Sequence, residues 1–142
     1  MAELNCQFVR PDRLLYEGPV ASLILVTHSG ELGVWPGHAS EICSLGDGIV
    51  RLRELPEKGG AEKSVIISGG YAEINPEGVI ILADHARDID DIDPDTVRRT
   101  RQKAFDLRDE LDEDDHRRAY YDNKIKWCNL LLQHSGEQGG TQ

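Results

Sequence analysis

One segment organises the first half of the chain: Gly30-Glu31-Leu32-Gly33-Val34-Trp35-Pro36-Gly37-His38-Ala39. It follows the apolar, strand-like run Val20–Thr27 and contains several glycines and a Pro-Gly pair. Because glycine permits positive φ and close backbone approach, and proline restricts φ, the segment predicts a shaped loop. One glutamate and one histidine in such a loop do not form an active site. Taken alone, the loop is either a corner between two strands or a contact surface.

Length and charge exclude several classes of protein. The 142 residues suffice for one ordinary domain, or for a small domain with an appendage. The formal charge of −10 argues against binding to nucleic acid or anionic lipid, because both need clustered lysine and arginine. No apolar run reaches the length of a membrane helix, and Met1–Asn5 show neither the basic start nor the apolar stretch of a signal peptide. We therefore expect no membrane span.

The first half has the pattern of an all-β domain. Short apolar runs alternate with turn signals about every 8–12 residues, which is typical of a sandwich or barrel. Leu4, Cys6 and Phe8 alternate with polar residues. Val50 and Leu52 alternate with Ile49, Arg51 and Arg53, so these two side chains, like the first three, are predicted to face the core. The predicted turns include Gly18-Pro19, Gly69-Gly70 and Pro76-Glu77-Gly78.

The second half has the pattern of helices and contains no glycine from residue 79 to residue 135. Asp93 is a suitable N-cap, and Pro94 follows it at the first helical position. The acidic run 109–115 interrupts the helical pattern and predicts a solvated turn. Two apolar stripes flank this run and predict an antiparallel helical hairpin: Val97, Ala104, Leu107 and Leu111, then Tyr121, Ile125, Cys128 and Leu132.

No constellation of residues predicts catalysis or metal binding. The candidate metal ligands lack short spacings such as CxxC or HxxxH; they are His28, His38, His85, Cys6 and Cys43. An odd number of cysteines is typical of reduced, buried thiols in a cytosolic protein. No Gly-x-Ser-x-Gly elbow and no visible nucleophile–base pair is present, which disfavours a small hydrolase. The chain is therefore predicted to be an interaction module without catalytic residues.

Several motifs, in order along the chain, resemble one family. Gly30–Ala39 is similar to the GELG-x-x-PGHAP loop of the epsilon subunit of F-type ATP synthase, of the bacterial type. Ser68–Ile74 resembles that family's SGG-aromatic-x-E-V segment, and Val79–Asp84 resembles its VTVLAD strand. Ile89–Asp93 resembles its acidic run into the first helix. The resemblance covers about residues 3–135, and the helices match in length and layout more than in residues.

This resemblance implies an N-terminal all-β flattened sandwich (residues 1–88, binding the rotor and the ring) followed by a C-terminal two-helix antiparallel hairpin (residues 89–135, regulatory). The polar tail, residues 136–142, is expected to be disordered. The implied function is that of a non-catalytic central-stalk subunit of a proton- or sodium-translocating F-type ATP synthase, which couples ring rotation to the catalytic head. The implied partners are the gamma subunit, the ring of c subunits and, when the hairpin extends and inhibits ATP hydrolysis, the catalytic alpha/beta head. The implied location is peripheral, at the cytoplasmic face of the bacterial cell membrane.

The resemblance also implies site residues. The contact loop toward ring and rotor comprises Gly30, Glu31, Gly33, Pro36, Gly37 and His38. The implied inhibitory contacts to the catalytic subunit are Arg117, Arg118, Lys124 and Lys126. No cofactor is expected, and ATP as a regulatory ligand would use Ile92, Asp93, Arg98 and Arg99. The chain departs from the family's pattern at Ser40 and Glu41, and at Thr96 and Val97 in place of the nucleotide motif's arginine and alanine.

A second hypothesis stays open. The chain could be a free-standing β-sandwich ligand-binding module with a helical dimerisation tail. This hypothesis predicts a ligand pocket within residues 1–88. It also predicts self-association through Tyr121, Ile125 and Leu132.

Overall fold

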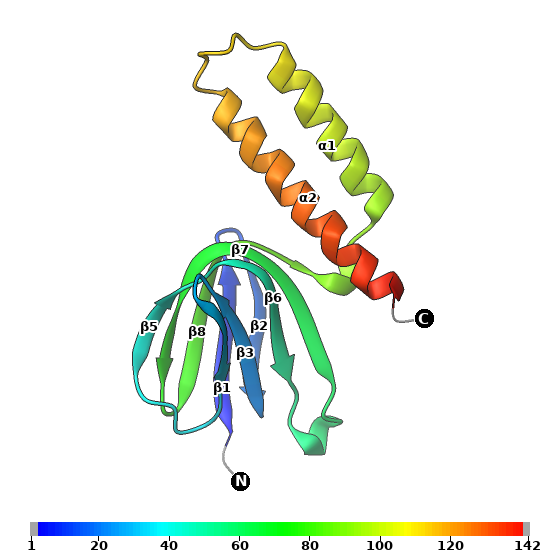
Figure 1. The fold of residues 1–142 in the computed structure, drawn as a ribbon. Coiled ribbons are helices and arrows are strands. Elements are labelled where there is room, and N and C mark those ends of the chain that lie inside the picture. Colours follow the sequence, from blue (N-terminus) through cyan, green and yellow to red (C-terminus); the bar gives the residue numbers. More distant parts are fainter. Residues whose placement is uncertain (1–2, 141–142) are drawn as a thin grey trace. The chain divides into compact units, whose positions relative to one another are not determined.

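The computed structural model describes residues 3–140, and their side chains as far as residue 135. It consists of two compact units, Met1–Asp88 and Ile89–Gln142, each with its own fold. An eight-stranded sheet forms the first unit, and two α-helices dominate the second (Figure 1). A β-sandwich followed by two helices confirms the predicted fold class.

The β unit is one sheet that curves into a sandwich. Along the sheet the strand order is β2-β1-β8-β7-β6-β3-β4, with β5 paired to β7. Neighbouring strands are antiparallel except β1 and β8, which are parallel. A short 3-10 helix, η1 (Pro56–Lys58), lies between β6 and β7. The strands are β1 (Leu4–Arg10), β2 (Arg13–Val20), β3 (Ser22–Thr27), β4 (Gly30–Val34), β5 (Glu41–Ser44), β6 (Asp47–Arg53), β7 (Glu62–Asn75) and β8 (Gly78–Asp88).

Strand β7 changes partner halfway along its length. Its first part, Glu62–Ser68, pairs with β6, and its second part, Tyr71–Ile74, pairs with β5. Between them, Gly69 and Gly70 have φ of +74° and +118°, values that residues with a side chain rarely adopt. A Cβ on Gly70 would lie 2.1 Å from the carbonyl oxygen of Leu82 in β8. The predicted turn at Gly69-Gly70 is therefore wrong: it is a kink inside one long strand, and β8 stays paired on both sides of it.

The predicted turn at Gly18-Pro19 is also wrong, because both residues lie within β2. Strand β2 is at the end of the strand order, so one of its edges is unpaired. Proline has no N–H to contribute to a ladder, and an edge strand tolerates it for that reason. The chain bends at Ala21 instead.

Alternation along the strands places one face of each in the core, as predicted. Leu4, Cys6 and Phe8 of β1 are buried, and so are Val50 and Leu52 of β6. Burying one such aliphatic or aromatic side chain stabilises a fold by about 1.5–3 kcal/mol. This core therefore holds the sandwich together. Its members from other strands include Leu23, Leu25, Val65, Ile67, Ile74 and Ile81.

The helical unit consists of a short 3-10 helix, η2 (Ile89–Asp91), and of α1 (Pro94–Asp109) and α2 (Arg118–Gly140). Asp93 caps α1 as predicted: its carboxylate accepts hydrogen bonds from the Asp95 N–H at 3.2 Å and from Thr96 Oγ1 at 2.7 Å. The hydrogen bond from Thr96 is the main cause that lowers the pKa of Asp93.

The two helices run antiparallel (Figure 1). Arg101 Nη1 donates to Asn129 Oδ1 at 2.9 Å, and Arg108 Nη1 donates to Asp122 Oδ1 at 3.0 Å. The residue numbers rise along α1 while those of the partners fall along α2, which only an antiparallel pair allows. Of the predicted stripes, four members are buried, and Leu131 is buried in place of Leu132; the four are Val97, Ala104, Ile125 and Cys128.

Helix α2 ends later than predicted, at Gly140 instead of residue 135. Residues 136–140 were expected to be a disordered tail, and their backbone continues the helix. Glycine lowers helix propensity without forbidding a helical conformation, and helix ends are the least predictable positions. The rest of that tail, residues 141–142, lies outside the described residues.

Candidate interaction surfaces

The segment Gly30–Ala39 is half strand and half loop. Strand β4 pairs with β3 along its whole length, and Val34 is buried at its end. The loop expected over the whole segment is therefore wrong for its first half, because an inward-facing side chain and a hydrogen-bonded ladder hold this half in the sheet. At about 3.3 Å per residue, β4 spans about 13 Å. Glu31 consequently lies within the strand, and His38 lies in the loop that follows it.

Glu31 lies at the β3–β4 hairpin, where Arg51 of β6 holds it. Arg51 Nη1 lies 2.7 Å from Glu31 Oε2, although 61% of the Glu31 side chain is exposed. The hairpin is closed by Thr27 Oγ1, which donates to the Gly30 carbonyl at 2.7 Å and accepts from the Ser29 N–H at 3.1 Å. Glu31 also lines a hollow of about 360 Å³ shared by the hairpin and β5. The hairpin thus presents an oriented carboxylate.

His38 belongs to the loop that follows β4. Its Nδ1 lies 2.7 Å from the Ala39 carbonyl oxygen, which can only accept, so Nδ1 donates this bond. Its Nε2 lies 3.8 Å from Oε1 of Glu41, one of the residues at which the chain departs from the resembled motif. The N–H of Gly37 donates to the Pro76 carbonyl at 2.9 Å and ties the loop to the β7–β8 turn. The hydrogen bond to the Ala39 carbonyl therefore orients the imidazole, and Glu41 lies nearby.

Trp35 explains the glycine at position 33. A Cβ on Gly33 would lie 2.3 Å from Cζ3 of the indole, so the ring occupies the space of the missing side chain. The indole remains 58% exposed. It lines a hollow of about 480 Å³ together with Pro36, Leu55 and Pro56. The predicted site residues Gly33 and Pro36 thus support an exposed aromatic ring.

An apolar row crosses four strands on the outer face of the sandwich. Val9 of β1 is opposite both Leu14 of β2 and Leu82 of β8, and Leu82 is opposite Tyr71 of β7. Leu14, Leu82 and Tyr71 are exposed by 49%, 38% and 53%. We call Leu14, Val9, Leu82 and Tyr71 the outer row. Contiguous exposed apolar side chains are typical of a surface that binds another protein.

The sequence patterns alone did not single out this row. A signal was present in Val79–Leu82, where four apolar residues in succession make both faces of the strand apolar. Ile80 of the same run is 37% exposed, and Ile42 of β5, the strand that pairs with β7, is 73% exposed. The row itself depends on register between distant strands, which no local pattern contains.

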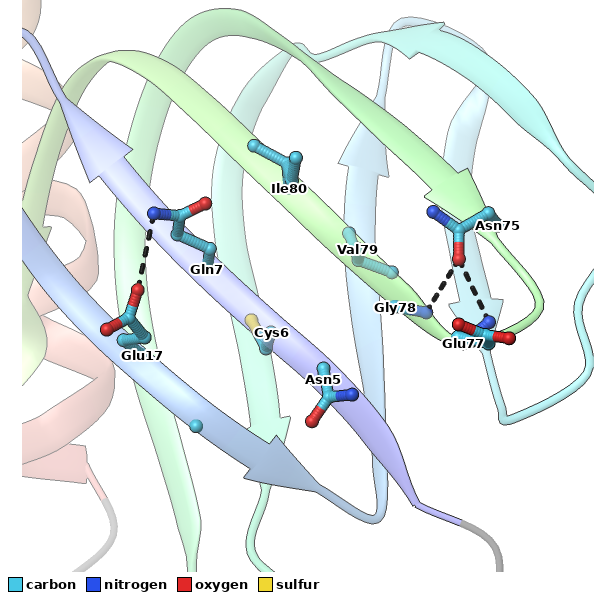
Figure 2. A pocket seen from close by; sticks show the side chains of 10 residues that line it. Asn5, Cys6, Gln7, Glu17, Asn75, Glu77, Gly78, Val79 and Ile80 are labelled. Atoms are coloured by element: carbon cyan, nitrogen blue, oxygen red, sulfur yellow. Dashed lines mark hydrogen bonds between the residues drawn. The ribbon is translucent and has the colours of Figure 1, made fainter.

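A groove of about 380 Å³, lined by both polar and apolar residues, lies on the same strands, near the start of β1 and β8. Figure 2 shows Gln7 and Glu17 facing each other from β1 and β2, and Gln7 Nε2 donates to Glu17 Oε2 at 3.3 Å. Asn75 Oδ1 accepts from the N–H groups of Glu77 and Gly78, both at 2.9 Å. Because these polar groups bond to one another, the groove suits a contact surface better than a small-molecule site.

The residues proposed for ATP lie together at the start of α1, but their side chains are engaged locally. Arg98 Nη1 lies 2.6 Å from Asp95 Oδ1. Arg99 Nη2 donates to Thr96 Oγ1 at 3.1 Å. Asp93 caps the helix, and Ile92 is only 8% exposed. Binding of a phosphate group by the two arginines would require them to leave these partners.

Two of the four basic residues proposed to contact the catalytic subunit stabilise the turn between the helices. Arg117 pairs with Asp115 at 2.7 Å, and the hydrogen bonds from Arg117 lower the pKa of Asp115 to about 2. Arg118 Nη1 donates to the carbonyl oxygens of Arg108 at 3.0 Å and Leu111 at 3.1 Å, at the end of α1. A cation at this helix end also interacts favourably with the helix dipole.

The other two basic residues, Lys124 and Lys126, are exposed on α2. Lys124 Nζ lies 5.8 Å from the centre of the Tyr120 ring, within the range of a cation–π contact. Tyr120 is itself 63% exposed. This part of α2 therefore offers positive charge and an aromatic ring to solvent.

Within the part of the chain that the structure describes, no group of three or more histidine, cysteine, aspartate or glutamate side chains could hold a metal ion, and His28, His38, His85, Cys6 and Cys43 do not gather. No helix among the described residues is long and apolar enough to cross a bilayer.

Known proteins resemble the chain in both sequence and fold. Residues 3–89 match the model of the family "ATP synthase, Delta/Epsilon chain, beta-sandwich domain". The ATP synthase epsilon chain of Moorella thermoacetica is 39% identical over 73% of this chain and 75% of its own length. That of Bacillus pumilus is 34% identical over 84% of this chain and 88% of its own length.

Two solved structures share the fold. A chain of the Euglena gracilis mitochondrial ATP synthase (OSCP/F1/c-ring) superposes with a TM-score of 0.64 at 24% identity, covering 98% of this chain and 82% of the other. A chain of the Tetrahymena thermophila mitochondrial ATP synthase (central stalk/c-ring) gives 0.52 at 14% identity, covering 93% and 96%. The matching family model, the sequence identities and the sandwich-plus-hairpin fold show that this chain belongs to the ATP synthase epsilon chains, a non-catalytic subunit.

Proposed function

We propose that this epsilon chain is a central-stalk rotor subunit that couples rotation of the c ring to the catalytic head. The observation that carries the proposal is the outer row, an exposed apolar strip across four strands of the family's sandwich domain. Exposed apolar surface of this kind raises the free energy in water, and a partner that covers the surface removes this cost. The gamma subunit is the partner we assign to the outer row.

The two ends of β4 supply the other contacts. We assign the Glu31 hairpin and the His38 loop to the ring and the rotor stalk. Hydrogen bonds hold each of these two segments in shape. The ring, and not this chain, would select protons or sodium ions as the coupling ion. Such a subunit would lie at the cytoplasmic face of the bacterial membrane, as a peripheral protein.

Co-purification with gamma and the c ring tests the rotor role. Leu82→Glu places a charge in the middle of the outer row and is expected to abolish recovery of the chain with gamma. Tyr120→Glu is the matched control, because it also charges an exposed apolar residue but lies on α2. A folded wild-type chain that shows no affinity for gamma would refute the proposal.

We further propose that the helical hairpin inhibits ATP hydrolysis by contacting the catalytic alpha/beta head. Lys124, Lys126 and Arg117 are exposed, as such contacts require, whereas Arg118 serves the turn itself. Truncation after Asp91 removes both α-helices and leaves the β unit whole. We expect the truncated chain to assemble normally and the complex to hydrolyse ATP faster. Unchanged hydrolysis would reduce the hairpin to a structural element.

We propose that the subunit works without a bound cofactor. The arginines that would bind ATP, Arg98 and Arg99, already have partners in the first turn of α1. Titration calorimetry of the full chain with ATP is expected to give no heat of binding. Binding that is lost in an Arg98→Ala/Arg99→Ala variant would instead establish ATP as a regulatory ligand at Ile92, Asp93, Arg98 and Arg99.

A further inference from the structure

We infer that Arg51 is a positioning residue for Glu31, and this role rests on the proposed contact of the Glu31 hairpin with the ring. The two residues belong to strands that do not pair, because β3 lies between β6 and β4. Arg51 is opposite Ile24 of β3, and Glu31 is opposite Val26 of β3. The guanidinium therefore reaches over β3 to the carboxylate, at 2.7 Å.

Stability alone does not account for this ion pair. The side chains of Arg51 and Glu31 are 32% and 61% exposed, and ion pairs of this kind add little to folding. The ion pair instead restricts the rotamers that the Glu31 side chain can adopt. A free glutamate side chain samples several rotamers, and ordering it at an interface weakens binding. With Arg51 in place, this ordering has already occurred before the partner arrives.

The carboxylate of Glu31 can still accept hydrogen bonds from a partner while Arg51 holds it. Arg51 bonds to Oε2, and within the described part of the chain no hydrogen bond involves Oε1 of Glu31. The side chain also borders the hollow of about 360 Å³ that includes Glu41 and Ser44 of β5. An ionised carboxylate accepts several hydrogen bonds, so one oxygen can stay with Arg51 while the other meets the ring.

A double-mutant cycle tests the role. The four chains are wild type, Arg51→Met, Glu31→Ala and the double variant, each bound with gamma to isolated c rings. Arg51→Met is expected to weaken binding about two- to tenfold, the range for losing the order of one side chain. In the Glu31→Ala background, Arg51→Met is expected to have no further effect, because Arg51 acts only through the side chain of Glu31. Equal losses in both backgrounds, or no loss in the wild-type background, would overturn the inference.

Arg53→Met is the matched control. Arg53 lies on the same strand and pairs with Glu62 at 2.9 Å, so its removal also breaks an exposed ion pair without touching Glu31. Ring binding by this variant should equal that of wild type. If it falls as much as that of Arg51→Met, then general loss of charge on β6 explains the effect and the inference is wrong.

A measurement on the full chain alone separates this inference from the rotor role. Side-chain NMR relaxation of Glu31 should show greater mobility in Arg51→Met than in wild type or Arg53→Met. Unchanged mobility would overturn the positioning role even if the chain binds the ring. Failure of the wild-type chain to bind any rotor partner would refute the proposed function, while the mobility result would still report whether Arg51 orders Glu31.

Discussion

Gly70 and Gly30 offer a matched pair for measuring what the β7 kink requires. Their φ angles are nearly equal, +118° and +122°, so alanine is strained at both, by about 1–3 kcal/mol. They differ in their surroundings. A Cβ at Gly70 would lie 2.1 Å from the Leu82 carbonyl oxygen and 2.8 Å from Ala83 Cα, whereas among the described residues no heavy atom lies within 4 Å of a Cβ at Gly30.

The clash at Gly70 is with backbone, which cannot move without breaking the β7–β8 ladder. Overpacking of this kind adds about 1–3 kcal/mol. We therefore expect Gly70→Ala to lower the free energy of unfolding by about 2 kcal/mol more than Gly30→Ala does. For a domain of this size, each kcal/mol shifts the melting temperature by about 4–8 °C, so the two variants should differ by about 8–16 °C.

Differential scanning calorimetry of the full chain measures this difference. The β-unit transition of wild type, Gly30→Ala and Gly70→Ala would be compared under one set of conditions. Equal shifts of the melting temperature for both variants would contradict this expectation, because they would show that β8 moves to accommodate a side chain at position 70. If Gly30→Ala lowers the free energy of unfolding as much as is expected for Gly70→Ala, backbone strain alone accounts for the destabilisation.

Further predictions concern single sites. Hydrogen bonds from Arg117 lower the pKa of Asp115 from 3.8 to about 2. Their contribution to folding stability is therefore present above pH 4 and is lost as the pH falls toward 2. Thermal melts of Asp115→Asn should lack this loss of stability at low pH. Burial raises the pKa of Cys6 to about 12, so at pH 8 Cys6 should resist iodoacetamide until the protein is denatured, as mass spectrometry would show. Gly33→Ala should displace the indole of Trp35, which lies 2.3 Å from the new Cβ, and acrylamide quenching of its fluorescence should increase.

Features set by near neighbours in the chain were predictable. The inward alternation of Leu4, Cys6 and Phe8 follows from the geometry of a strand, and the start of α1 follows from the Asp93-Pro94 pair. Glycine was ambiguous. A Gly-Gly pair such as Gly69-Gly70 can either end a strand or bend one. Only the pairing of β8 on both sides of the pair shows that it bends β7. The same limit applies to Gly18-Pro19, whose place in an edge strand depends on distant partners.

Local sequence patterns predict the order of a β domain and a helical hairpin, the core-facing positions and the segment that carries Glu31 and His38. These depend on local periodicity and on motif order, which the chain contains directly. Three features become visible only in the folded chain: Glu31 lies within β4 and His38 in the loop after it, Arg51 holds Glu31 across β3, and Leu14, Val9, Leu82 and Tyr71 form one row. These features depend on strand register. Register comes from hydrogen bonds between residues far apart in the chain, whose alignment is decided by burial of the whole core.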